Sequence, residues 1–106
     1  MLAIATLAYI VPLDQVVAHT DAHRAYLASL HARGKLLASG PFVPRTGGAL
    51  LLNVADDAEL KALIAADPFH ALKIAEYQAR IWSPTIGADV FAALAAAAPA
   101  PTPAPK

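Results

Sequence analysis

Cysteine is absent from the 106 residues, and charged residues are few. Without cysteine, the chain has no disulfide, no thiolate nucleophile and no cysteine-ligated metal site. Only 15% of the residues are charged, and eight acidic residues balance eight basic ones. Nucleic-acid-binding proteins normally carry a basic patch, and no basic run is present, so we exclude that class of partner. A low charge content near net neutrality instead favours self-association.

The apolar N-terminal segment is too short to cross a membrane. It ends at Pro12, whereas a spanning helix needs roughly 20 apolar residues. It also lacks the basic start and the clear cleavage site of a secretory signal. A buried strand explains the segment better, and we expect a cytoplasmic protein with no membrane partner.

Apolar periodicity and turn residues predict a single α+β domain. Four apolar segments bounded by proline, glycine or polar residues are predicted to be strands: Leu2–Val11, Lys35–Phe42, Ala49–Val54 and Ile74–Trp82. Pro44–Gly48, between the second and third of these segments, is predicted to be a hairpin turn because proline and glycine dominate it.

Two helices are predicted between the strands. The first covers Leu13–Arg33 and is followed by Gly34, a typical C-cap residue. Its apolar stripe recurs in steps of three and four residues, at Val16, Thr20, His23, Leu27 and Leu30. The second begins at a cap at Asp56 or Asp57 and ends at Asp67-Pro68. The order βαββαβ is the ferredoxin-like plan, with a four-stranded antiparallel sheet.

We assign residues 1–88 to this domain and residues 89–106 to an Ala/Pro-rich tail. A short helix is expected to begin near Asp89, and the four prolines after Ala98 then favour an extended chain. A sheet with helices on one face leaves its other face to be buried. We therefore expect a homodimer in which a second subunit covers that face.

Two ionisable residues occupy positions that should face the sheet. His23 lies on the stripe of the first helix, and Asp67 continues the stripe of the second, Leu60–Leu63–Ile64. A buried imidazole or carboxylate needs a polar partner, and the simplest arrangement is that the two residues meet. A carboxylate that contacts an imidazole fixes its tautomer and makes it a better proton acceptor. The alternative is a structural core pair with no catalytic task.

Further side chains are candidates for contacts with a ligand: Ser39, Arg45, Phe69 and His70. Each has a simpler explanation, as a strand hydroxyl, a solvated cation, a core aromatic residue and a loop residue respectively. His19 and His23 stand four residues apart, as metal ligands on a helix do, but no HExxH pattern is present, and a third ligand would have to come from Asp67 or His70. We expect no metal site.

Four segments of the chain resemble the YciI-like (YCII-related) family, from about Leu2 to Pro84: His23-Arg24-Ala25-Tyr26-Leu27, Gly34-Lys35-Leu36-Leu37-Ala38-Ser39-Gly40-Pro41, Pro44-Arg45-Thr46-Gly47-Gly48 and Asp67-Pro68-Phe69. The resemblance implies a dimeric ferredoxin-like α/β-barrel whose active site contains His23 and Asp67. It also implies chemistry such as dehydrochlorination of a chlorinated hydroxyquinol or lactone isomerisation, without a metal or organic cofactor. The sequence departs from the family pattern at Thr20, where an arginine is common, and at Lys73, where a glycine is common.

Two functions follow from these observations. The first is a cofactor-independent enzyme that eliminates or isomerises a small cyclic or aromatic molecule, with His23 as base or acid and Asp67 as its orienting partner. The second is a non-catalytic dimeric module that binds a small molecule. A third, simpler possibility is a domain whose pocket is filled by side chains.

Overall fold

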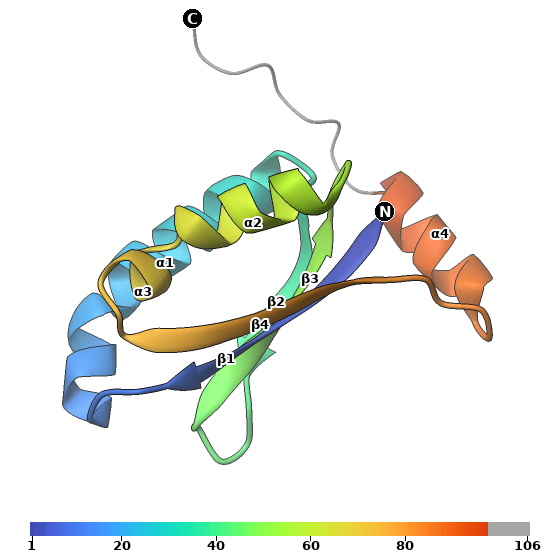
Figure 1. Ribbon diagram of the computed structural model, residues 1–106. Helices are drawn as coiled ribbons and strands as arrows, with labels where there is room; N and C mark the ends of the chain where they lie inside the picture. The colour runs from blue at the N-terminus through green and yellow to red at the C-terminus, as the bar shows by residue number, and fades with distance from the viewer. Residues whose placement is uncertain (98–106) are drawn as a thin grey trace, which may run out of the picture.

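The computed structural model describes residues 1–97 and contains four strands and four helices (Figure 1). In chain order these are β1 (Leu2–Tyr9), α1 (Leu13–Ala32), β2 (Leu36–Pro41), β3 (Gly47–Asn53), α2 (Asp57–Ala65), α3 (Pro68–Ala71), β4 (Ala75–Trp82) and α4 (Ala88–Ala97). The extended segment predicted after Ala98 lies outside the described residues. No helix within residues 1–97 is long and apolar enough to span a membrane.

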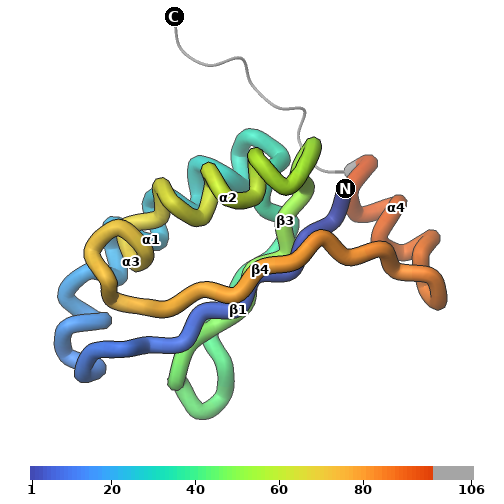
Figure 2. The backbone as a smooth tube through the Cα atoms, viewed as in Figure 1, coloured from blue at the N-terminus to red at the C-terminus, as the bar shows by residue number. Residues whose placement is uncertain are grey.

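The strands form one antiparallel sheet in the order β2-β3-β1-β4. This arrangement confirms the predicted α+β, ferredoxin-like fold. The β1–α1–β2 and β3–α2–α3–β4 segments bring α1, α2 and α3 to the same face of the sheet, as Figures 1 and 2 show. The opposite face carries none of these three helices, and α4 lies beyond the end of the sheet.

The core lies between the sheet and the helices α1, α2 and α3. Side chains of a strand alternate between its two faces, and the inward positions of β1 and β3 are the buried ones. The helix stripe predicted from the sequence is also buried, at Val16, Thr20, His23, Leu27 and Leu30. The sheet thus presents alanines and leucines to a helix face that also holds two polar residues.

The hairpin turn lies two residues earlier in the chain than the sequence predicted. Gly47 and Gly48 were expected in the turn, but they are the first residues of β3 and pair with Ala8 and Leu7 of β1. A side chain at Gly47 would overlap the carbonyl oxygen of Leu7, and a Cβ at Gly48 would lie 2.6 Å from the Gly40 carbonyl oxygen. These two glycines are therefore needed because neighbouring strands approach closely, and not because the chain turns there.

A four-residue helix, α3, was not predicted. Asp67 is its N-cap, and the Asp67 side chain accepts a hydrogen bond from the Phe69 backbone N–H, with Pro68 at the first helical position. Asp67 therefore does not continue the stripe of α2, which ends at Ala65. Its carboxylate is buried because the turn between α2 and α3 directs it inward.

Helix α4 begins at Ala88, next to the predicted start at Asp89. Its Phe91 ring meets the Trp82 ring edge to face, with centroids 5.1 Å apart. This contact joins α4 to the end of β4.

We predict that Gly47→Ala destabilises the protein by about 1–3 kcal/mol or more, because the added methyl group overlaps backbone that cannot move without disturbing β1. Gly40→Ala is the matched control, since a Cβ at Gly40 meets no atom within 4 Å. Denaturant unfolding of both variants measures the difference. Equal stabilities would show that the close approach does not constrain Gly47.

Candidate active site

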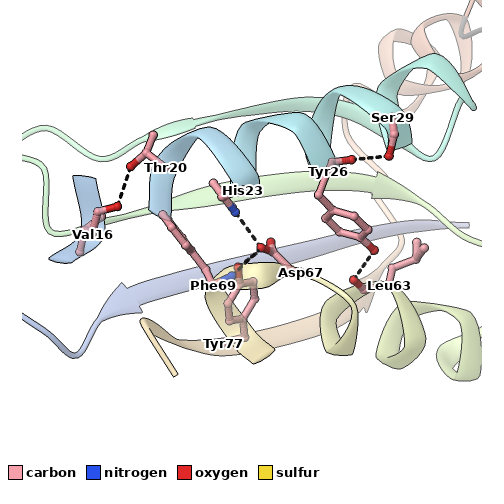
Figure 3. Close-up of polar contacts among 9 residues, drawn as sticks. All are labelled: Val16, Thr20, His23, Tyr26, Ser29, Leu63, Asp67, Phe69 and Tyr77. Carbon is pink, nitrogen blue, oxygen red and sulfur yellow. Dashed lines mark hydrogen bonds and ion pairs between the residues drawn. The ribbon is translucent and has the colours of Figure 1, made fainter. Parts of the chain in front are cut away.

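The imidazole of His23 is held between a carboxylate and an aromatic ring. It belongs to the buried stripe of α1 and is 9% exposed. The Phe69 ring stacks on it, with centroids 3.9 Å apart and planes 1° from parallel. Its Nδ1 lies 2.8 Å from Oδ1 of Asp67. The pairing predicted from two apolar-face positions is therefore present, and Figure 3 shows the two side chains converging from α1 and from the start of α3.

Asp67 is 1% exposed and accepts three hydrogen bonds. The donors are His23 Nδ1 at 2.8 Å, the Phe69 backbone N–H at 3.0 Å and the Tyr77 hydroxyl at 2.6 Å. An ionised carboxylate only accepts hydrogen bonds, so three donors around it match its charged form. With Nδ1–H donating to Asp67, the neutral imidazole has its lone pair on Nε2.

Tyr77 is a member of this site that the sequence analysis did not name as a candidate. Burial raises the pKa of Tyr77 well above its usual value, and its hydrogen bond to Asp67 raises it further. The phenol therefore stays protonated and remains a donor to the carboxylate. Tyr77 lies at an inward position of β4. A phenol at an inward strand position, which needs a polar partner when buried, was the available signal.

His23 also lines an open cavity between α1 and the sheet. The cavity has a volume of about 250 Å³ and is also lined by Tyr9, Leu27 and Phe69. Among the described residues, no buried side-chain nitrogen or oxygen lacks a hydrogen-bond partner. Since Nε2 of His23 makes no hydrogen bond to the protein, this atom is exposed to solvent, and the residue lines the cavity. Asp67 does not line the cavity; it contacts the imidazole at Nδ1.

The four candidate ligand contacts are placed differently. Ser39, Arg45 and Phe69 line the cavity, together with Thr20 and residues of the β2–β3 hairpin. His70 does not line it. The His70 side chain is exposed. Its ring meets the ring of Tyr77 edge to face, with centroids 5.7 Å apart.

Arg45 reaches back from the hairpin to α1 and β1. Its Nη2 donates to the Thr20 hydroxyl and its Nε to the Tyr9 hydroxyl, each at 3.3 Å. The Thr20 hydroxyl itself donates to the Val16 carbonyl oxygen at 2.8 Å. These contacts keep the guanidinium at the cavity, although the residue is otherwise exposed.

Metal binding has no support from the arrangement of ligands. Within residues 1–97, no three side chains of His, Asp or Glu gather closely enough to hold a metal ion. His19, the possible partner of His23, is half-buried on α1, and His23 uses Nδ1 to contact Asp67.

Comparison with known proteins identifies the family. A model of the YCII-related domain matches residues 2–83. The chain belongs to this family. A search of curated protein sequences finds no match. Among solved structures, the chain is similar to 5-chloro-2-hydroxyhydroquinone dehydrochlorinase (TftG) from Burkholderia phenoliruptrix AC1100, in complex with 2,5-dihydroxybenzoquinone. The TM-score is 0.70 and the sequence identity 21%, over 81% of this chain and 97% of that one, so the likeness shows a shared fold.

We predict that Tyr77→Phe lowers the free energy of unfolding by about 1.5–3 kcal/mol, because a hydrogen bond to a buried charged group is lost. Tyr26→Phe is the matched control. Its hydroxyl donates to the neutral Leu63 carbonyl oxygen at 2.6 Å, and its loss should cost about 0.5–1.5 kcal/mol. Urea unfolding at neutral pH compares the two. A smaller cost for Tyr77→Phe than for Tyr26→Phe would contradict an ionised Asp67.

Proposed function

We propose that this YCII-related protein is a cofactor-independent acid–base enzyme that acts on a small cyclic or aromatic molecule. The reaction would be an elimination such as dehydrochlorination, or an isomerisation. The observation that carries the proposal is the orientation of His23. Its Nδ1 is anchored on a buried carboxylate, while Nε2 is exposed to solvent and the residue lines a cavity.

In the proposed reaction, Nε2 of His23 takes a proton from a C–H or hydroxyl O–H group of the bound molecule. In an elimination, the electron pair left by that proton forms a new double bond, directly or through conjugation, and chloride leaves from a saturated carbon. In a chlorinated hydroxyquinol, the proton comes from a hydroxyl group, and the saturated carbon is the ring carbon that carries hydrogen and chlorine in the keto tautomer. In an isomerisation, the proton returns to another position. Asp67 remains ionised, holds the ring in one tautomer and stabilises the imidazolium that forms. The Tyr77 hydroxyl and the Phe69 N–H keep the carboxylate in place.

The size of the cavity supports a small substrate. Its volume of about 250 Å³ is below the range typical of drug-sized ligands, about 300–1,000 Å³. A single ring with a few substituents fits this space. The similar dehydrochlorinase structure holds 2,5-dihydroxybenzoquinone, a molecule of that size. Ser39, Arg45 and Phe69 are the proposed contacts with the substrate, and His70, which lies outside the cavity, is left out.

The alternative is a non-catalytic binding module. It is favoured by one observation: His23 is the only His, Asp or Glu among the described residues that line the cavity. A reaction that needs two separate proton carriers would therefore depend on the Tyr9 hydroxyl, the substrate or water for the second one. The binding module predicts saturable binding without chemical change in any ligand.

We also propose that the protein acts as a homodimer, and in the cytoplasm. The sheet face opposite α1, α2 and α3 is formed in its centre by apolar side chains that are only half-buried in the single chain: Leu2, Ile4, Ala49 and Leu51. A second copy that covers this face would remove these side chains from water.

We predict that His23→Gln and Asp67→Asn each reduce turnover by about 100-fold or more. His23→Gln removes the proton acceptor, and Asp67→Asn removes the carboxylate that fixes the tautomer of the imidazole. Chloride release from 5-chloro-2-hydroxyhydroquinone, and proton–deuterium exchange into lactones, provide the measurements. His31→Gln is the control, since His31 is an exposed imidazole of the same helix that contacts the Leu36 carbonyl oxygen.

Thermal unfolding accompanies these assays. His23→Gln should remain folded at the assay temperature. If this variant is folded and turns over substrate as fast as the wild type, the catalytic proposal is wrong. If it fails to fold, the His23–Asp67 pair is structural.

We predict that size-exclusion chromatography with light scattering gives a molar mass twice the 11.0 kDa of one chain. Leu51→Glu, which places a charge at the centre of the open sheet face, should give a folded monomer, because a buried unpaired charge is costly. Ala28→Glu, at an exposed position of α1 and therefore away from the open sheet face, is the control. A wild-type monomer at micromolar concentration would refute the dimer.

A further inference from the structure

The charged side chains around the cavity all have the same sign. Arg24 and Arg45 line it beside His23, and no Asp or Glu of the described chain does. The whole chain has a formal net charge of zero, so this one-sided arrangement is local. A cleft lined by cations attracts and concentrates anions.

Arg45 has hydrogen-bond donors to spare. A guanidinium carries five N–H groups, and Arg45 uses one on Thr20 and one on Tyr9. Both distances are 3.3 Å, so these contacts are long and position the group without saturating it. Within residues 1–97, no carboxylate forms an ion pair with Arg45. Three N–H groups of the permanently charged Arg45 guanidinium therefore remain for a ligand.

The neighbours of Arg45 extend this donor set. The Thr20 hydroxyl gives its proton to the Val16 carbonyl, so its oxygen faces Arg45 as an acceptor. The Tyr9 hydroxyl accepts from Arg45 and has no acceptor for its own proton among the described residues. The guanidinium centre also lies 6.0 Å from the Tyr9 ring centroid. The site thus presents three N–H donors and one phenol donor to an anion.

The anion position and the proposed base are close together. Thr20, which contacts Arg45, and His23 are three residues apart on α1 and are therefore neighbours on its surface. A wall of aromatic rings connects the same two points: Tyr9 meets Phe69 edge to face at 6.2 Å, and Phe69 stacks on His23. A ligand lying along this wall would therefore have Arg45 and Tyr9 at one end and His23 at the other.

We propose that the ligand of this cavity is a monocyclic carboxylate, with its carboxylate held by Arg45 and Tyr9 and its ring directed towards His23. A carboxylate has two oxygens in one plane, which matches the planar fork of a guanidinium. The proposal deepens the proposed function, since it names the substrate class of the same site. Arg24, at the exposed rim of the cavity, adds positive charge at the entrance.

Calorimetric titration with two probes of the same shape tests the charge preference: 4-hydroxybenzoate and 4-hydroxybenzamide. The wild type should bind the carboxylate about tenfold or more tightly than the amide. Hydrogen bonds to a charged group are about twice as strong as neutral ones, and a difference of about 1.4 kcal/mol corresponds to tenfold in affinity. Arg45→Gln should lose this preference while its affinity for the amide is unchanged. Arg33→Gln, which removes an exposed arginine outside the cavity, should keep it.

Three results would overturn the proposal: equal affinity of the wild type for both probes, no binding of either probe at millimolar concentration, or a carboxylate preference that survives in Arg45→Gln. Arg45→Lys guards against a purely structural effect, because it keeps the charge and should retain part of the preference. Thermal unfolding confirms that each variant is folded.

His23→Gln separates this proposal from the catalytic one. If it binds 4-hydroxybenzoate with the wild-type preference and has lost turnover, both proposals stand. If wild type and His23→Gln share the preference and neither turns over substrate, the carboxylate site stands and the enzyme proposal fails. If turnover depends on His23 but the preference is absent, the substrate class is wrong and the acid–base function remains.

Discussion

The carboxylate of Asp67 is the point at which three elements of the fold are joined. It accepts one hydrogen bond from α1 through His23, one from the backbone of α3 through Phe69, and one from β4 through Tyr77. A carboxylate that is almost fully buried is stable only when donors replace the water it has lost. The positions of these three elements and the charge of Asp67 therefore depend on one another. The imidazole of His23 is oriented by an interaction that also holds the core together.

The cavity beside His23 is formed partly by two glycines of β3 and by the β2–β3 hairpin. Gly47 and Gly48 let β3 approach its neighbours closely, and the chain before them carries Arg45 back to α1. The base comes from α1 and the cation from the hairpin. Both line the cavity, and aromatic and apolar side chains form much of the remaining lining. Such a cavity favours a ligand with a charged end and a flat apolar body.

Periodic patterns in the sequence predicted the parts of the fold that repeat. The stripe of α1 repeats over five buried residues, and it correctly placed His23 facing the sheet. Apolar segments bounded by proline, glycine or polar residues predicted the four-stranded sheet. The burial of Asp67 was also predicted, but for the wrong reason, because α3 has only four residues and is too short to show a period. Asp67-Pro68 marks the cap and first position of that helix, a signal that was read as the end of α2.

Apart from the His23–Asp67 pair, the features that depend on contacts between distant segments were not predicted. The two glycines were assigned to the turn because nothing in their local sequence reveals how closely β1 and β2 approach them. The Tyr77 contact depends on the position of β4 relative to α3. Lys73 has a φ of 57° and so occupies a left-handed conformation that glycine adopts more easily. The glycine that the family resemblance implied at this position would fit that backbone, and Lys73 does not line the cavity.

The parallel stack of Phe69 on His23 has a stereochemical consequence. Phe69 covers one side of the imidazole with its ring, and its own N–H bonds the carboxylate that holds Nδ1. The imidazole is thereby prevented from turning over, and one nitrogen alone can exchange protons with a bound molecule. In the proposed isomerisation, a hydrogen removed from one side of a substrate ring would be delivered back to that same side. A migration of this kind is suprafacial, and the handedness of the product is then decided by which side of the substrate rests towards α1.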